Sequence, residues 1–126
     1  MDYRIEDKFD SNEDLYRAVL PRDVFNKENG TISSAAFKTS RGCSVERSYD
    51  RNETEIIEFM KKFFKGAFIV TVKVDECEKV DAYVIYKPSQ RSNYHSEIWK
   101  SEDTVLLTKS QAKKLANCAK MVYYPY

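Results

Sequence analysis

Basic side chains interleaved with hydroxyls run through the first half of the chain, and a short polar segment around the single histidine follows later. Guanidinium forks, ammonium groups and hydroxyls are the donors that bind phosphate oxygens in proteins. We therefore predict that these segments converge on a phosphate-binding site. The predicted ligand-binding residues are Arg17, Ser33, Ser34, Lys38, Ser44, Arg47, Asn93 and His95.

His95 is the candidate catalytic residue, because an imidazole can transfer protons near neutral pH. If it is functional, we expect Arg17, Lys38 or Arg47 close to its ring, in a concavity open to solvent. If it is structural, we expect a buried ring that is hydrogen-bonded to the backbone or to a carboxylate. Whether the protein is an enzyme stays open at this level.

Several catalytic and binding motifs are missing from the sequence. No GxSxG nucleophile motif accompanies His95, and neither a GxGxxG nor a GxxxxGK[ST] phosphate loop is present. Cys43, Cys77 and Cys118 lie far apart and form no CxxC pair, so zinc-type spacing is absent. A Cys–His dyad with His95 stays an alternative. The sequence therefore predicts no metal site and no cofactor.

A second basic feature lies near the C-terminus. On a helix, Lys109, Lys113 and Lys120 fall within about 40° of each other and form a basic ridge beside an apolar face. Such a ridge would contact the phosphates of a nucleic acid, with strong salt dependence. A solvated helix face is the alternative interpretation. The tyrosines of the chain could stack on bases, or form cross-strand pairs in a sheet.

Two principal helices are predicted. The clearer one runs from about Glu53 to Lys65, where apolar residues recur on one side, with Asn52 as N-cap and Glu55 completing a capping box. The last helix begins after Thr108, with Gln111 in the reciprocal capping position. Its apolar side comprises Ala112, Leu115, Ala116, Ala119 and Val122.

Alternating or β-rich runs predict strands at 32–38, 43–47, 68–74, 80–87 and 95–100. The runs 68–74 and 80–87 are expected to pair as a hairpin across a charged turn at 75–79. Residues 15–20 fit a short helix or a strand after a cap at Ser11. The fold class is therefore α+β, a single small domain over residues 11–126, mainly antiparallel sheet with two principal helices packed on one face. The acidic residues 1–10 are expected to be mobile.

Composition narrows the class of protein. The 126 residues are 42% hydrophobic and 13% aromatic, which suits one globular domain with its own core. The 21 basic and 20 acidic residues leave a net charge of +1, so no global field attracts nucleic acid or a membrane. The charged N-terminus has no apolar signal region, the apolar runs are too short to span a bilayer, and the scattered cysteines fit reduced thiols. We expect a cytoplasmic protein with no membrane partner.

Five short pieces of the chain, taken in order, resemble a group of small uncharacterised bacterial proteins. The pieces are Leu15-Tyr-Arg17, Ser33 to Lys38, Ser44-Val45 followed by Arg47, Asn93-Tyr-His95, and Lys109 to Ala116. They span most of the chain, whereas residues 66–87 depart from the pattern of the group. The resemblance implies a prokaryotic, cytosolic setting and brings no established activity with it.

A more distant similarity is to ADP-ribosyltransferase-like and RES-type domains. It consists of Leu15-Tyr-Arg17 and the later Ser33-Ser34. It implies an enzyme whose acid would be Glu97, although the chain is short for such domains.

Besides this distant enzyme similarity, two hypotheses describe the function. The first is a small prokaryotic cytosolic domain that binds a phosphate-bearing partner, either a nucleotide or a nucleic acid, through Arg17, Lys38, Arg47 and His95. The second is a protein–protein accessory module, such as an immunity protein, an antitoxin or a subunit of a defence system. The first hypothesis is the preferred one; near-neutral charge, the missing nucleophile motif and the many tyrosines are the reasons for considering the second.

Overall fold

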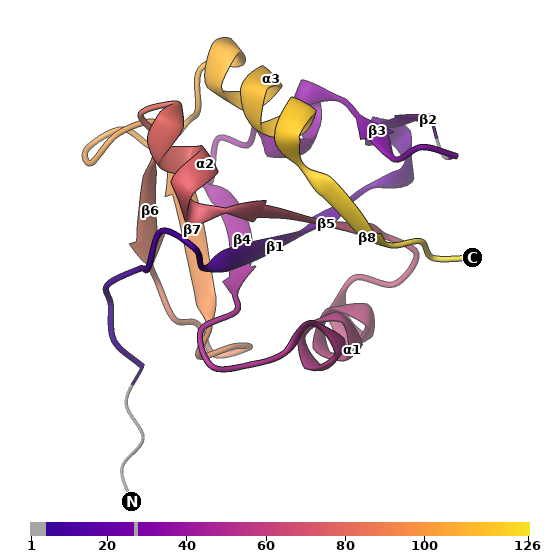
Figure 1. Cartoon of the computed structure of the whole chain (residues 1–126), viewed down its shortest axis with the longest axis horizontal. Coiled ribbons are helices and arrows are strands. Elements are labelled where there is room, and N and C mark those ends of the chain that lie inside the picture. Colours follow the sequence, from indigo (N-terminus) through magenta and orange to yellow (C-terminus); the bar gives the residue numbers. More distant parts are fainter. Residues whose placement is uncertain (1–4, 27) are drawn as a thin grey trace, which may run out of the picture.

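Within the described residues, 5–26 and 28–126, six strands form an antiparallel sheet in the computed structural model (Figure 1). Their order across the sheet is β6-β7-β4-β1-β5-β8. The strands are β1 (Asp14–Val19), β4 (Cys43–Arg47), β5 (Phe68–Lys73), β6 (Tyr83–Tyr86), β7 (His95–Trp99) and β8 (Lys120–Tyr123). A separate two-stranded ribbon consists of β2 (Val24–Asn26) and β3 (Thr31–Ile32).

Helices join these strands into an α+β fold, as predicted. They are α1 (Glu53–Phe63), α2 (Val74–Lys79) and α3 (Lys109–Cys118), together with the short 3-10 helices η1 (Pro21–Asp23) and η2 (Ser34–Phe37). Among the described residues, none of these helices combines the length and hydropathy needed to cross a bilayer.

The two principal helices lie on opposite faces of the sheet, and not on one face as expected (Figure 1). Under α1, Ile56 packs in a buried cluster with Tyr16 of β1. On the other face, Leu115 of α3 belongs to the larger core that contains Leu15. Because successive strand residues point to opposite faces, the neighbours Leu15 and Tyr16 make both faces apolar. Each face therefore needs a cover of its own.

Local capping signals give the two helix starts correctly, although of the two expected capping boxes only that of α3 has both of its hydrogen bonds. The Asn52 side chain accepts a hydrogen bond from the Glu55 amide at 2.9 Å, and α1 begins at the next residue after this cap. At α3 the bonds are reciprocal: the Gln111 amide donates to Thr108 Oγ1 at 3.0 Å, and the Thr108 amide donates to Gln111 Oε1 at 2.9 Å. Each pair satisfies amides that a helix N-terminus leaves without partners.

The predicted hairpin of 68–74 with 80–87 is wrong. The segment 74–79 forms helix α2 where a turn was expected, and Glu76 accepts a hydrogen bond from the Lys73 amide at 2.7 Å. This helix carries the chain away from β5, which pairs with β1 and β8. Strand β6 instead pairs with β7.

Three further segments resolve or correct the local predictions. Residues 14–19 form a strand, so the strand and not the short helix is the correct one of the two structures expected at 15–20. Of the strand expected at 32–38, only Ile32 lies in a strand, because the Ser33 side chain accepts a hydrogen bond from the Ala35 amide and starts η2. The last helix ends at Cys118, and Lys120 lies in strand β8.

The three thiols differ in burial, which predicts which of them reacts. Cys43 and Cys77 are buried, and burial raises the pKa of both thiols. Cys118 is exposed, and burial of part of its side chain, together with Glu76, raises its pKa to about 11. Since the thiolate is the reactive form, we expect iodoacetamide to modify only Cys118 in the folded protein. The expected rate near neutral pH is more than about tenfold below that of a free thiol, and it rises with pH.

Mass spectrometry of the intact protein over time measures this rate. The unfolded chain, with three ordinary thiols, is the control. Modification of Cys43 or Cys77 as fast as that of Cys118 would contradict the prediction.

Candidate functional site

Strands β1 and β4 separate after a short paired stretch, and Arg17 occupies the opening. The register joins only Leu15 with Arg47 and Tyr16 with Glu46. Beyond this point Arg17 Nε donates to the Ala36 carbonyl at 2.5 Å, and Nη1 donates to the Ser44 carbonyl at 2.7 Å. The second bond gives the Ser44 carbonyl of β4 a partner, and the first joins Arg17 to η2. They fix a guanidinium between the two strands.

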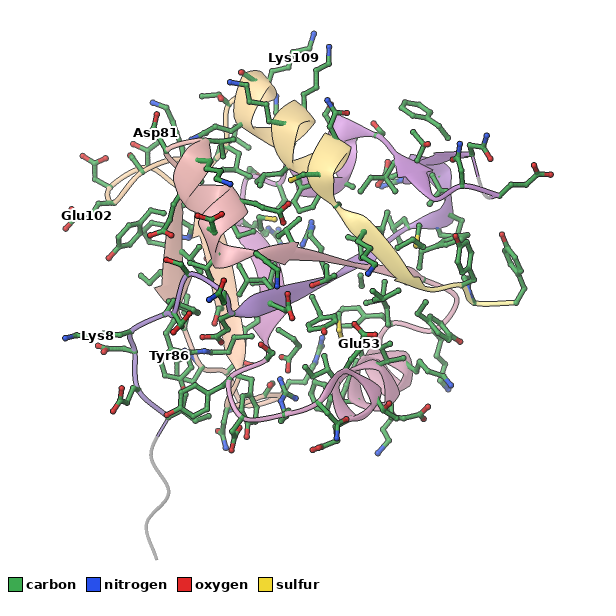
Figure 2. The ribbon with its side chains drawn as sticks, viewed as in Figure 1. Lys8, Glu53, Asp81, Tyr86, Glu102 and Lys109 are labelled. Carbon is green, nitrogen blue, oxygen red and sulfur yellow. The ribbon has the colours of Figure 1, made fainter. Side chains whose placement is uncertain are left out.

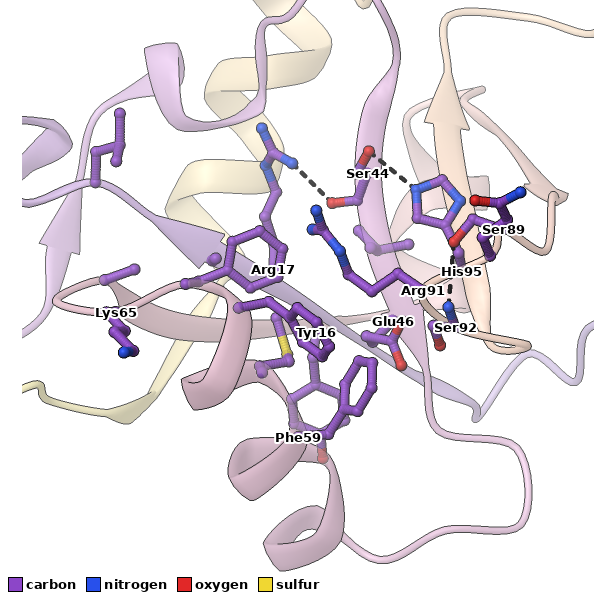
Figure 3. Close-up of a pocket in the computed structure, with 18 residues that line it drawn as sticks. Tyr16, Arg17, Ser44, Glu46, Phe59, Lys65, Ser89, Arg91, Ser92 and His95 are labelled. Atoms are coloured by element: carbon purple, nitrogen blue, oxygen red, sulfur yellow. Dashed lines mark hydrogen bonds between the residues drawn. The ribbon is translucent and has the colours of Figure 1, made fainter.

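A cavity of about 980 Å³ lies on the α1 side of this opening (Figure 3). Phe59, Phe63 and the following Phe64 supply an aromatic wall. The polar wall comes from β1, β4, β7 and the loop before β7. Its residues include Arg17, Ser44, Ser89, Arg91, Ser92 and His95.

His95 and Ser44 form a hydrogen-bonded pair in this cavity. His95 Nδ1 lies 2.7 Å from the Lys87 carbonyl oxygen, and Nε2 lies 3.1 Å from Ser44 Oγ. Because a carbonyl only accepts, a neutral ring carries its proton on Nδ1. Nε2 is then an acceptor for the Ser44 hydroxyl. Arg17 lines the same cavity as His95 and donates to the backbone of Ser44. The ring itself is half-buried and bonded to a backbone carbonyl, so it has features of both the functional and the structural alternative.

Arg91 brings a second guanidinium into the cavity, and Figure 3 shows it directed toward Arg17 and Ser44. Its Cζ lies 5.0 Å from the centroid of the Phe63 ring and 5.6 Å from that of Phe64, at cation–π distance. Within the described part of the chain, Arg91 makes no hydrogen bond and no ion pair, and Arg17 has no carboxylate partner. Sequence reasoning did not name Arg91 as a ligand-binding residue. The sequence feature that could have identified Arg91 is its place in the polar loop before His95.

Among the described residues, a single carboxylate lines this cavity, and it is paired with a guanidinium. Glu46 Oε2 accepts from Arg51 Nη2 at 2.8 Å, and both side chains are nearly buried. Lys65 adds another positive charge to the rim. The cavity therefore carries an excess of positive charge opposite an aromatic wall.

Tyr16 forms part of the base of the cavity and is locked as a hydrogen-bond donor. Its hydroxyl donates to Glu53 Oε1 at 2.9 Å. Burial, followed by the Glu53 carboxylate, raises the pKa of Tyr16 well above its usual range. The phenol is neutral at physiological pH and adds no negative charge to the site.

The other predicted ligand-binding residues do not line this cavity. Ser33 caps η2, with Ser34 and Lys38 at the two ends of that short helix. The backbone carbonyl of Asn93 accepts a hydrogen bond from the Tyr86 hydroxyl at 2.5 Å. Arg47 is fully buried and paired with Glu13, so a structural role replaces the predicted ligand contact.

The predicted basic ridge lies away from the cavity. Lys109 and Lys113 belong to α3 on the opposite face of the sheet, and Figure 2 shows Lys109 far from Glu53 of α1. Lys120 is not part of that helix, so the predicted helical alignment of the three lysines is incorrect. The three lysines do not extend the positive surface of the cavity.

Glu97, the acid implied by the similarity to ADP-ribosyltransferase-like domains, is buried and engaged. Its Oε1 accepts from Trp99 Nε1 at 2.8 Å, and its Oε2 lies 3.7 Å from Lys87 Nζ. It does not line the cavity that holds Ser44 and His95. The described residues include no group of three or more His, Cys, Asp or Glu side chains placed to hold a metal ion.

No protein-family model matches the chain, and neither a curated protein nor a solved structure matches it. The resemblance to small bacterial proteins therefore stays a prediction.

Proposed function

We propose that the cavity binds a small phosphate ester that carries an aromatic group, and that a nucleotide is the ligand class. One observation carries this proposal. Two guanidiniums, which have no carboxylate partner within the described chain, share one cavity with an exposed aromatic wall. Phosphate oxygens accept charge-assisted hydrogen bonds from guanidinium forks. Arg17 and Arg91 are therefore the proposed phosphate-binding residues.

The aromatic wall supports a base on the ligand. Phe63 is 46% exposed, although it sits on a helix whose other apolar side chains are mostly covered. Stacking of a base on an aromatic side chain contributes roughly 1–3 kcal/mol and tolerates any base. The size of the cavity falls at the upper end of the range of small-molecule sites. Both features fit a nucleotide better than inorganic phosphate.

The distribution of lysines favours a mononucleotide over a nucleic acid. A bound duplex or strand needs a continuous basic track along its backbone. Lys109 and Lys113 lie across the sheet from the cavity, so they do not form such a track with Arg17 and Arg91.

Isothermal titration calorimetry with nucleoside mono- and diphosphates tests this proposal. We expect Arg91→Gln to weaken nucleotide binding by about tenfold or more, because it removes charge-assisted hydrogen bonds. The variant should keep the thermal stability of the wild type, since Arg91 is exposed and makes only cation–π contacts within the described chain.

Lys113→Gln is the matched control, because it removes a positive charge from the opposite face and should leave the affinity unchanged. Inorganic phosphate and short oligonucleotides serve as comparison ligands at two salt concentrations. Equal loss of affinity in Arg91→Gln and Lys113→Gln would indicate a nonspecific charge effect. No binding of any nucleotide by the wild type would refute the proposal.

The accessory-module hypothesis is favoured by a different surface. Phe25 of β2 is 75% exposed. Aromatic side chains are enriched in protein interfaces. Recovery of a partner from the native host by wild type and not by Phe25→Ser would support this function.

A further inference from the structure

We propose that Ser44 is a nucleophile activated by His95 and that the cavity hydrolyses a phosphodiester bond. This inference rests on the proposed function, since it takes the bound phosphate of that ligand as the reacting group. It assigns a reaction to a serine that has no GxSxG motif around it.

The hydrogen bonds around His95 leave its ring poised as a base. The Lys87 carbonyl lies 2.7 Å from Nδ1 and holds the proton there, which leaves the lone pair of Nε2 facing Ser44 Oγ at 3.1 Å. The backbone fixes this carbonyl, since the Lys87 amide donates to the His95 carbonyl at 3.0 Å. A base that is oriented by a third group is the arrangement that activates serine nucleophiles. Here a main-chain carbonyl takes the position of the usual carboxylate.

Ser44 itself is held on both sides while its hydroxyl stays accessible. On one side β4 pairs with β7, with Ser44 opposite Glu97. On the other side the Ser44 carbonyl accepts from Arg17 Nη1 at 2.7 Å. The residue is exposed and lines the cavity. A nucleophile fixed in this way retains its position relative to His95 during a reaction.

The positive charges near Ser44 suit attack at phosphorus. Negative charge on the phosphoryl oxygens must be balanced at the transition state, and guanidiniums perform this role in phosphoryl transfer. Arg17 lies beside the backbone of Ser44, and Arg91 points into the same space with its donors unoccupied among the described residues. Glu46 does not cancel this charge because it is paired with Arg51.

The reaction proceeds in two balanced steps without a change of oxidation state. In the first, Ser44 Oγ attacks phosphorus, its proton moves to His95 Nε2, and the bond from phosphorus to the leaving oxygen breaks. His95 gives that proton to the leaving alcohol. In the second, water loses a proton to His95 and attacks phosphorus, the bond to Oγ breaks, and Ser44 takes the proton back. One water is consumed, and an alcohol and a phosphomonoester are released.

Bis(4-nitrophenyl) phosphate tests this reaction on the full-length protein. We expect release of 4-nitrophenolate and an intact-mass increase equal to one 4-nitrophenylphosphoryl group, which peptide mapping places on Ser44. Ser44→Ala should abolish both signals. His95→Asn retains a donor for the Lys87 carbonyl but lacks Nε2, and it should slow release by about 100-fold or more.

Ser110→Ala, on the exposed surface of α3, is the control for serine removal and should react as the wild type does. Circular dichroism melting confirms that each variant is folded. Absence of both 4-nitrophenolate release and an adduct with the wild type, or wild-type rates in Ser44→Ala, would overturn the assignment.

Nucleotide titration of the same variants separates this inference from the proposed function. If Ser44→Ala binds nucleotides as the wild type does while the wild type neither releases 4-nitrophenolate nor forms an adduct, the nucleophile assignment fails and the binding function stands. If nucleotides do not bind but the Ser44 adduct forms, the proposed ligand class fails and the nucleophile assignment stands for a different phosphodiester.

Discussion

Replacing Arg47 with Met is expected to lower the free energy of unfolding by about 3–5 kcal/mol. Arg47 is fully buried, and its guanidinium donates to Glu13 at 2.7 and 2.9 Å. Its other donors reach the carbonyls of Glu6 and Lys8. The variant removes one partner only, so the carboxylate of Glu13, whose side chain is 6% exposed, would stay buried without its counter-ion.

Three aromatic rings add to the environment of this guanidinium. Its Cζ lies 4.1 Å from the centroid of Phe9, 4.8 Å from that of Tyr49 and 5.2 Å from that of Tyr86. Through these contacts Arg47 joins residues 6–13 to strands β4 and β6. We therefore expect the loss of Arg47 to release this segment as well as to destabilise the sheet.

Urea denaturation measures the effect, with two controls. Lys73→Met breaks the ion pair between Lys73, whose side chain is 50% exposed, and Asp14, whose side chain is 37% exposed. This variant should change the free energy of unfolding by less than about 1 kcal/mol. The double variant Glu13→Gln/Arg47→Met removes both charges and should recover part of the loss. An Arg47→Met effect no larger than that of Lys73→Met would contradict the structural role assigned to Arg47.

Gly42→Ala is the second substitution with a large expected effect, a loss of about 3 kcal/mol. Gly42 has a φ of +107°, which side chains rarely adopt. A Cβ there would lie 2.7 Å from Glu97 Cδ and closer still to Oε1. The carboxylate has little freedom to move, because it is buried and accepts from Trp99 Nε1.

Gly66→Ala is the matched control for this prediction. Gly66 has a φ of +80°, and nothing lies within 4 Å of the position of an added Cβ. It isolates the backbone strain, which we expect to cost about 1 kcal/mol. Urea midpoints of the two variants give the difference, which is the contribution of the contact with Glu97. Equal losses for the two variants would show that Glu97 does not constrain the turn before β4.

Local signals in the sequence determined much of the secondary structure. Asn52 and Thr108 mark the starts of α1 and α3, and the strand 43–47 was predicted with the bounds that the structure gives. Caps and short alternating runs act over three to six residues, so they need no knowledge of the rest of the fold. The α+β class follows from counting such segments.

Pairing between distant segments decided which polar residues meet. Ser44 and His95 are 51 residues apart, and they make contact because β4 pairs with β7. Arg17 reaches the Ser44 backbone because β1 and β4 separate beyond Tyr16. The sequence placed all three in its list of candidates, yet residue type alone gave no reason to prefer them over Lys38.

The contrast between Ser44 and Arg47 shows the physical reason most clearly. They lie three residues apart in one strand, and side chains alternate between faces, so the two point to opposite sides of the sheet. Sequence determined this alternation by itself. Only the tertiary structure decided that the face of Ser44 opens into a cavity beside α1, while the face of Arg47 is closed by residues 6–13 and the buried carboxylate of Glu13.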